Sequence, residues 1–299
     1  MSLIEELGFE SEERVVVVHV DDVGMSRAAN DGALDALAGA ATCGSIMVPC
    51  PAFEEIAAVA RGRGELDFGV HLTLNAEYPE YRWPPLCDDV PGLVSPDGGM
   101  WPTLREVVEH ATPEEVDREL RAQIDRALAA GIDVTHLDSH MGTVLEPKFI
   151  DVYIQLARDY TLPSFIPRVG PQVLARAAGS ERVEFYVKLL GEVEASGLPV
   201  FDYFCADSLS FEPGTGLAHN KSRLERFGSG LSYLITHCAR GDDQLQSITA
   251  DWRQRDEEHR IYSDGSMGRE IAAAGIRSIG MRPLRDLVRG KRATPPEAR

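Results

Sequence analysis

The sequence is short of basic residues. Lys and Arg number 30 against 48 Asp and Glu, which gives a formal net charge of −18. Binding to nucleic acid needs clustered Lys and Arg, and an excess of acid also disfavours an anionic membrane surface. We therefore expect neither nucleic acid nor a membrane as a partner, and we interpret the acidic excess as a solvated surface.

Long apolar runs and paired cysteines are also missing. No stretch approaches the roughly 20 apolar residues of a membrane span, and residues 1–14 lack the basic and apolar regions of a signal peptide. The five cysteines contain no Cys-x-x-Cys pair, so they predict reduced thiols and neither a disulfide framework nor a structural zinc site. The expected compartment is the cytoplasm.

Short β-branched runs alternate with helical segments along the chain. Residues 15–20 (VVVVHV) are typical of a parallel strand buried on both faces, and no Gly-x-Gly-x-x-Gly of a dinucleotide fold follows them. About eight such strands, nearly all separated by helices, predict an α/β fold. We expect a TIM-like (β/α) barrel with seven or eight parallel strands; imperfect closure stays open, and a doubly wound open sheet is the second choice.

The predicted organisation is a single barrel domain over residues 1–290 with a frayed, disordered tail at 291–299. A stretch at about 75–101, rich in Pro, Gly and aromatic residues, predicts a long loop insertion of the kind that forms active-site walls. The predicted strands are 15–20, 45–48, 68–74, 134–138, 165–169, 200–204, 231–237 and 276–280. The predicted helices are 28–41, 52–61, 113–131, 147–160, 171–196, 249–262 and 267–274.

A barrel of this kind places its reactive residues at the carboxyl ends of its strands. The first strand ends in His19-Val20-Asp21-Asp22, the third carries His71, and the fourth ends in His136-Leu-Asp138-Ser-His140. Side chains alternate along a strand, so His136, Asp138 and His140 share one face. Three polar groups on one strand tip are hard to explain as core.

Two adjacent carboxylates, Asp21 and Asp22, directly follow the apolar run. A buried carboxylate is costly unless something neutralises it, and a divalent cation would make one Asp a ligand and leave the other as a base. Capping of the following helix is an equally good explanation for this pair alone. A single strand histidine such as His71 is more often a hydrogen-bonded core residue than a ligand.

The conjunction of these groups favours a metal site. An Asp and two His on separate strand ends form a facial arrangement that leaves positions for water and substrate. Such a site suits zinc, and magnesium, manganese or nickel are also compatible with the ligand types. His237, at the end of the strand 231–237, is placed either as a general acid or as a structural histidine beside Cys238.

At these residues the sequence resembles the YdjC-like, ChbG-type carbohydrate deacetylases, relatives of the NodB-type polysaccharide deacetylases. The opening family motif, Asn-Ala-Asp-Asp-Phe-Gly, corresponds to VHVDDVGMS at residues 18–26. Gly-Val-His-Leu-Thr stands at 69–73, His-x-Asp-Ser-His is intact at 136–140, and Pro-Ala-Phe stands at 51–53. The similarity extends from about residue 15 to 149 and more faintly to about 284.

The resemblance implies a TIM-like barrel with one divalent metal ion, zinc or magnesium, held by Asp22, His71 and His140. It implies that Asp21 is the general base. The late family motif His-Pro-Gly aligns with residues 237–239, so only His237 carries over, as the candidate acid. We place the remaining polar groups, His19, His136 and Asp138, behind the ligands or against the substrate.

Three positions depart from the family pattern: His19 replaces the usual Asn, Val23 the usual Phe, and Gly142 a further His found in many members. The proposed ligands are retained, so these departures bear on the pocket and the substrate. The implied function is metal-dependent deacetylation of an N-acetylated sugar or oligosaccharide, a small-molecule substrate, with release of acetate. Hydrolysis of another amide, ester or phosphoester, and a sugar- or metal-binding module with a degenerate site, remain alternatives. Whether the protein forms a homodimer is left open.

Overall fold

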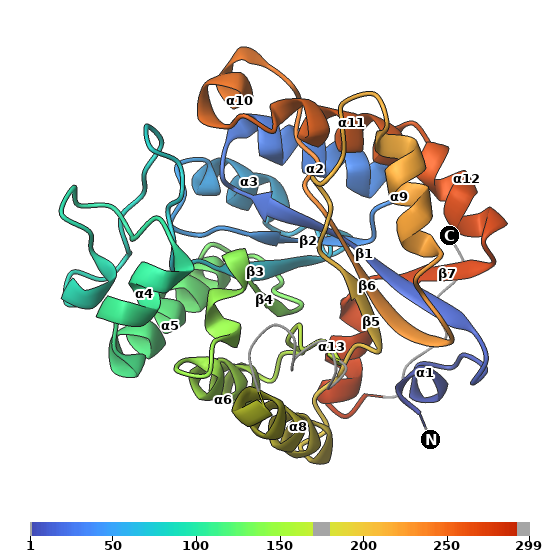
Figure 1. Cartoon of the computed structure of the whole chain (residues 1–299), viewed down its shortest axis with the longest axis horizontal. Helices are drawn as coiled ribbons and strands as arrows, with labels where there is room; N and C mark the ends of the chain where they lie inside the picture. Colours follow the sequence, from blue (N-terminus) through green and yellow to red (C-terminus); the bar gives the residue numbers. More distant parts are fainter. Residues whose placement is uncertain (1, 170–179, 292–299) are drawn as a thin grey trace.

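The strands form one parallel sheet in the computed structural model, which describes residues 2–169 and 180–291 (Figure 1). All six strand pairings are parallel, and helices surround the strands on the outside. The predicted α/β class is therefore confirmed. The strands are β1 (Arg14–Val23), β2 (Cys43–Ile46), β3 (Phe68–Leu72), β4 (Leu137–Ser139), β5 (Tyr203–Cys205), β6 (Gly230–Thr236) and β7 (Ile276–Ile279).

The sheet curls into a barrel with incomplete closure. Its strand order is β4-β3-β2-β1-β6-β5. The backbone of 163–168 joins the two edges: Phe165 N donates to Leu137 O at 2.9 Å, and Phe201 N donates to Ile166 O at 2.9 Å. This segment forms two isolated bridges, Leu137–Ser164 and Pro167–Phe201, and not the regular strand predicted at 165–169. The barrel prediction holds, and the doubly wound open sheet does not.

Strand β1 is the longest and lies at the centre of the fold. Its amino half pairs with β7, its carboxyl half pairs with β2, and β6 follows it from Arg14 to Val20. Val15–Val18 are fully buried, as the uninterrupted apolar run predicts. This pairing places the carboxyl end of β1 beside that of β6 and one strand away from that of β3, where the polar motifs lie.

The helices agree with the sequence pattern where they are long. Helix α5 begins at Pro113, after a capping box in which Thr112 accepts from Glu115 N. Of the predicted helix 171–196, residues 180–195 are helical, and 170–179 lie outside the described residues. The helices are α1 (Leu3–Glu6), α2 (Arg27–Ala38), α3 (Phe53–Ala60), α4 (Leu104–His110), α5 (Pro113–Ala129), α6 (Ile150–Tyr160), α8 (Ser180–Ala195), α9 (Gly216–Leu224), α10 (Asp243–Ile248), α11 (Trp252–Ser263), α12 (Ser266–Ala273) and α13 (Arg282–Val288), with short 3-10 turns η1 (Pro91–Leu93) and η2 (His140–Leu145).

The 75–101 segment is an ordered loop with its own buried side chains. Trp83 is buried and its indole N–H donates to Asn75 O at 2.8 Å, while Val94 and Met100 form an antiparallel bridge. This packing fixes the start of the loop over the carboxyl end of β3. The loop therefore presents Glu77 and Tyr78 to the polar strand ends.

The structure also shows the length of the helices relative to a bilayer and the state of the cysteines. Within residues 2–169 and 180–291, no helix has the length and apolarity needed to cross a bilayer. All five cysteines are free thiols, as their spacing predicts.

Candidate active site

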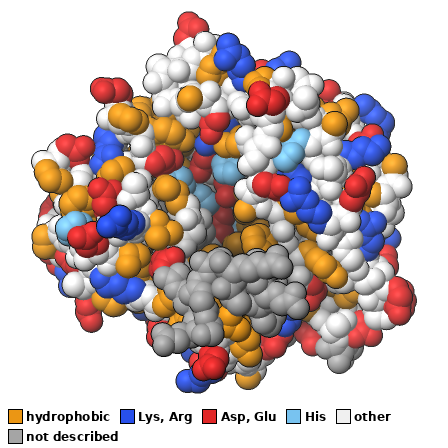
Figure 2. All heavy atoms as spheres, viewed as in Figure 1, with side chains coloured by type: hydrophobic (Ala, Val, Ile, Leu, Met, Phe, Trp, Pro, Cys, Tyr) orange, Lys and Arg blue, Asp and Glu red, His pale blue; other side chains and the backbone are white. Residues whose placement is uncertain are grey.

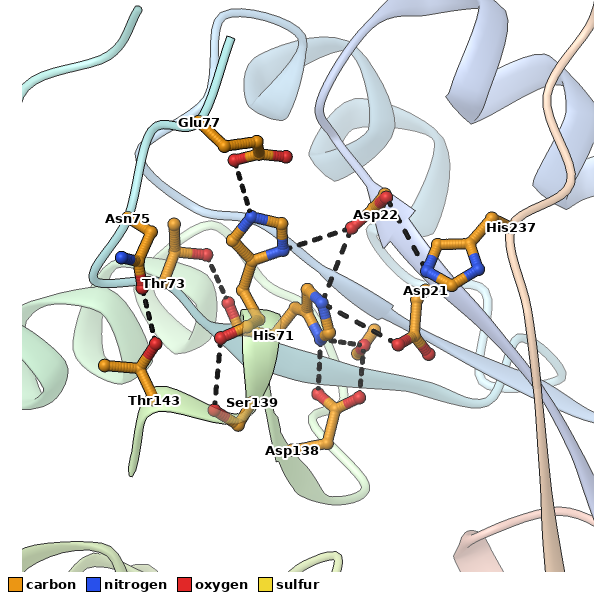
Figure 3. Close-up of polar contacts among 12 residues, drawn as sticks. Asp21, Asp22, His71, Thr73, Asn75, Glu77, Asp138, Ser139, Thr143 and His237 are labelled. Carbon is orange, nitrogen blue, oxygen red and sulfur yellow. Dashed lines mark hydrogen bonds and ion pairs between the residues drawn. The ribbon is translucent and has the colours of Figure 1, made fainter. Parts of the chain in front are cut away.

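Asp22, His71 and His140 converge at the carboxyl ends of β1, β3 and β4. Figure 3 shows Asp22 and His71 side by side in this cluster. Asp22 Oδ1 lies 3.5 Å from His71 Nε2 and 3.3 Å from His140 Nδ1. All three side chains are buried, and their ligand atoms lie within 4.8 Å of one another. The structure thus brings together the three residues that the sequence places at a metal site.

The backbone of Asp22 explains how two adjacent carboxylates reach one site. Consecutive residues of a regular strand point to opposite faces, but Asp22 has a φ of 63° and the pairing of β1 with β2 shifts register between Val20 and Val23. A positive φ is uncommon for a residue with a Cβ, although Asp tolerates it. The irregularity turns Asp22 toward the same opening as Asp21.

The two oxygens of Asp22 have different surroundings. Oδ2 accepts a hydrogen bond from Arg255 Nη1 at 2.7 Å, whereas Oδ1 is buried and has no hydrogen-bond partner among the described residues. Burial alone would raise the pKa of Asp22, but the Arg255 guanidinium and the imidazoles of His140 and His71 hold it well below its usual range. The carboxylate is therefore ionised, and its Oδ1 lies at ion-pair distance from both imidazoles.

Arg255 comes from helix α11 and is almost completely buried. Its guanidinium also donates to Asp251 Oδ1 at 2.8 Å and to the Tyr78 hydroxyl at 3.2 Å. Sequence reasoning missed this residue, because α11 reads as a polar, solvated helix. Only the fold reveals that one of its arginines faces inward.

A carboxylate holds the outer nitrogen of each histidine. His71 Nδ1 donates to Asp138 Oδ1 at 2.9 Å, with Ser45 donating to the other oxygen of Asp138, and His140 Nε2 lies 2.9 Å from Glu77 Oε2. These contacts orient His71 Nε2 and His140 Nδ1 toward Asp22, as the partners of metal-bound imidazoles commonly do. Asp138 was predicted to orient a ligand; Glu77 and Ser45 were not predicted, and the only signal was the position of Glu77 in the long loop.

The same contacts shift the pKa values of these groups. Burial alone would lower the pKa of both imidazoles, but Asp138 and Asp21 raise that of His71 well above its usual range. Glu77 and Asp22 raise the pKa of His140 to about 9. Burial would raise the pKa of Asp138, yet His71 and His19 lower it to about 2. The carboxylates of the cluster therefore favour positive charge on both rings.

The donor set fits a divalent ion. Asp22 Oδ1 is buried without a hydrogen bond among the described residues and faces one nitrogen of each ring, while the other nitrogen of each ring is already hydrogen-bonded. Each neutral ring would therefore present a lone pair at this point. Two imidazole nitrogens with one carboxylate oxygen suit zinc better than magnesium, which prefers oxygen ligands.

Asp21 lies beside this cluster and is held from behind by His19. The distance from Asp21 Oδ1 to His19 Nδ1 is 2.6 Å, and the other oxygen lies 3.9 Å from His71 Nε2. His19 Nε2 lies 2.8 Å from His136 Nε2, and Thr135 lies beyond, 2.9 Å from His136 Nδ1. His19 and His136 therefore lie behind Asp21 in the barrel interior and not against the metal cluster.

A glycine makes room for the second of these rings. A Cβ added at Gly69 on β3 would lie 2.6 Å from the His136 imidazole, far closer than packing allows. Burial and the charge of His19 lower the pKa of His136 well below its usual range, so this ring is neutral. The Gly-x-His motif of β3 thus serves both the metal cluster and the chain of histidines behind Asp21.

His237 faces Asp22 from the end of β6, with Nε2 3.9 Å from Asp22 Oδ2 (Figure 3). Its Nδ1 lies 3.0 Å from Ser208 Oγ, and Ser208 in turn donates to Glu258 at 2.7 Å. Glu258 also accepts from the backbone N–H of His237 at 2.7 Å. These contacts fix the ring, whereas Cys238 is buried with its pKa raised well above its usual range by that burial, which makes a poor nucleophile.

Asp21 and His237 both line one pocket of about 460 Å³, a size typical of small-molecule sites. Figure 2 shows this hollow, with histidine and acidic side chains on one wall and apolar side chains on another. The site therefore combines a candidate base and a candidate acid beside a cluster suited to a cation.

Comparison with known proteins supports the same grouping. Residues 15–273 match the family model described as YdjC-like protein, so the chain belongs to the YdjC-like family. It is 41% identical to a carbohydrate deacetylase of Thermus thermophilus over 279 residues, covering 91% of this chain and 94% of the relative. It is 31% identical to a carbohydrate deacetylase of Geobacillus stearothermophilus over 273 residues, covering 90% and 97%.

A solved structure shares the fold. A crystallised protein of Enterococcus faecalis V583, provisionally described as a cellobiose-phosphate cleavage protein, superposes with a TM-score of 0.74 at 24% identity, covering 91% of this chain and 99% of that one. At that identity the likeness concerns the fold alone.

Proposed function

We propose that this protein is a metal-dependent deacetylase that hydrolyses the amide of an N-acetylated sugar and releases acetate. The observation that carries the proposal is the convergence of Asp22 Oδ1, a buried oxygen without a hydrogen bond among the described residues, with one oriented nitrogen each of His71 and His140. A second carboxylate, Asp21, lies beside them. The relatives named carbohydrate deacetylases support the choice of substrate.

Asp22, His71 and His140 would hold the ion. A divalent ion bound there supplies Lewis-acid polarisation of the acetyl carbonyl and lowers the pKa of water. Arg255 keeps Asp22 ionised and leaves its Oδ1 available. Asp138 and Glu77 keep the two rings in the tautomers that ligation requires.

Asp21 is the proposed general base. It accepts a proton from the attacking water as the new carbon–oxygen bond forms, and His19 fixes the orientation of its carboxylate. His237 is the proposed general acid, because an amine anion is a very poor leaving group. As the carbon–nitrogen bond breaks, the ring donates its proton to the departing sugar nitrogen, giving acetate and a free amine.

The test is release of acetate from N-acetylglucosamine oligomers by the purified protein, with and without a chelator. We expect release that the chelator abolishes and that zinc or another divalent ion restores. Release that resists exhaustive chelation would contradict the metal role. No release from any acetylated sugar by metal-loaded protein would favour another hydrolase reaction or a binding module.

A further inference from the structure

The described lining of the pocket beside Asp21 and His237 is largely apolar. It lies between the end of β4, the bridging segment 163–168, helix α8 and strands β5 and β6. The apolar side chains that form its walls are Leu145, Phe165, Pro167, Phe204, Tyr233 and Ile235. A pyranose ring needs hydrogen-bonding groups for its hydroxyls, and these walls supply few.

Three aromatic rings form a continuous wall that leads away from the catalytic groups. The ring of Tyr233 stacks on His19 at 4.9 Å, and its centroid lies 4.4 Å from that of Phe165. Phe165 in turn meets Phe204 at 6.0 Å. The wall therefore extends from the His19–Asp21 pair to the rim of the pocket.

Polar groups in the pocket are mostly engaged elsewhere. Asp138 is bonded to His71 and Ser45, and the Tyr186 hydroxyl donates to the carbonyl of Pro167. The Tyr233 hydroxyl is buried without a hydrogen-bond partner among the described residues. Among the described residues, the apolar walls therefore supply most of the pocket surface away from Asp21 and His237.

The rim continues the apolar surface. Met141, Phe185 and Phe204 are 46%, 37% and 37% exposed, although large apolar side chains usually avoid water. All three line the mouth of the same pocket. Apolar side chains gathered at the mouth of a pocket mark a binding surface more often than chance exposure.

We propose that the natural substrate is an amphiphilic N-acyl sugar that places an apolar chain in this pocket. The chain belongs either to an N-acyl group longer than acetyl or to an apolar aglycone on the sugar. This inference rests on the proposed hydrolase function and specifies its substrate class.

The test is calorimetric titration of the metal-loaded protein with two ligand series, both below their micelle concentrations. One series is the methyl, butyl and hexyl glycosides of N-acetylglucosamine; the other is glucosamine N-acylated with acetyl, butanoyl and hexanoyl groups. Each buried methylene tightens binding by up to about fourfold, so we expect at least about a tenfold gain from the shortest to the longest ligand in one series. The heat-capacity change should become more negative with chain length.

Affinity that stays flat or falls with length in both series would overturn the proposal. Which series shows the gain identifies the part of the substrate that carries the chain. Release of the acyl group is measured separately on the same ligands. A gain in affinity without release of the acyl group would contradict the proposed hydrolase function but support the apolar binding pocket. Release without a gain in affinity would support the hydrolase function and contradict the apolar binding pocket.

A matched pair of variants locates the effect. Phe204 lines the pocket, and its neighbour Tyr203, equally exposed, does not. Phe204→Ser should reduce the gain from chain length by roughly fivefold, since it removes apolar wall, while Tyr203→Ser should leave it unchanged. Equal effects of the two substitutions, or none from Phe204→Ser, would place the chain elsewhere and contradict the proposal.

Discussion

The imidazole of His19 lies 2.6 Å from the carboxylate of Asp21, in the fully buried part of β1. The ring has a second partner, because its Nε2 reaches His136 at 2.8 Å. Asn is the usual residue at this position in the family pattern. Its side chain could form a hydrogen bond with Asp21 but has no second ring nitrogen to contact His136. The candidate base is therefore held here by a histidine pair.

Replacing His19 by Asn tests that arrangement. His19→Asn should keep an amide beside Asp21 but lose the contact with His136, so kcat should fall by about 10–100-fold with KM and metal content nearly unchanged. Steady-state kinetics and metal analysis of the same preparation check this. His19→Ala should lose more than His19→Asn. A loss of metal in His19→Asn would instead indicate a structural role.

Arg255 should contribute most to the free energy of unfolding when no ion is bound. Arg255→Met leaves Asp22 as a buried charge without its partner, and breaking a buried pair costs about 3–5 kcal/mol. We expect that loss in urea unfolding of chelated protein and a smaller loss with zinc, since the ion would compensate the charge of Asp22. Arg253→Met, on the exposed face of the same helix, is the control. Equal losses with and without metal would separate Arg255 from the cation site.

Much of the fold and half of the site follow from local sequence patterns. The strand at 15–20, the capping box at Thr112 and the His-x-Asp-Ser-His motif are each readable within a few residues. Arg255 is not, because its partner Asp22 is 233 residues away and nothing in the polar sequence of α11 distinguishes it. Barrel closure was equally hidden, since 163–168 contributes isolated bridges whose partners depend on the curl of the whole sheet.

Proton competition predicts how metal binding depends on pH. Glu77 and Asp22 raise the pKa of His140 to about 9 against the effect of burial, so the ring is protonated at neutral pH in metal-free protein. An ion must displace that proton and also the one on His71, whose pKa Asp138 and Asp21 raise well above its usual range. Metal affinity should therefore rise by more than about tenfold per pH unit below about pH 9, with release of protons on binding. Titrations in buffers of different ionisation enthalpy measure both quantities; an affinity independent of pH from 6 to 8 would contradict this.

The leaving group decides whether His237 is the acid. An amine leaves only with a proton, whereas an activated phenol leaves without one, so His237→Ala should cripple amide hydrolysis and spare hydrolysis of an acetate ester of such a phenol. The comparison of kcat/KM on the two substrates is the measurement. Equal losses on both would assign His237 to binding or structure, and no loss on either would remove it from the reaction.

The most direct test of the account is the metal content of Asp21→Asn and Asp22→Asn, measured alongside acetate release. If Asp22 is a ligand and Asp21 the base, Asp22→Asn should lose the ion. Asp21→Asn should retain it while kcat falls by about 10²–10⁴-fold. Loss of metal from Asp21→Asn, with full metal in Asp22→Asn, would contradict the assignment of the two carboxylates.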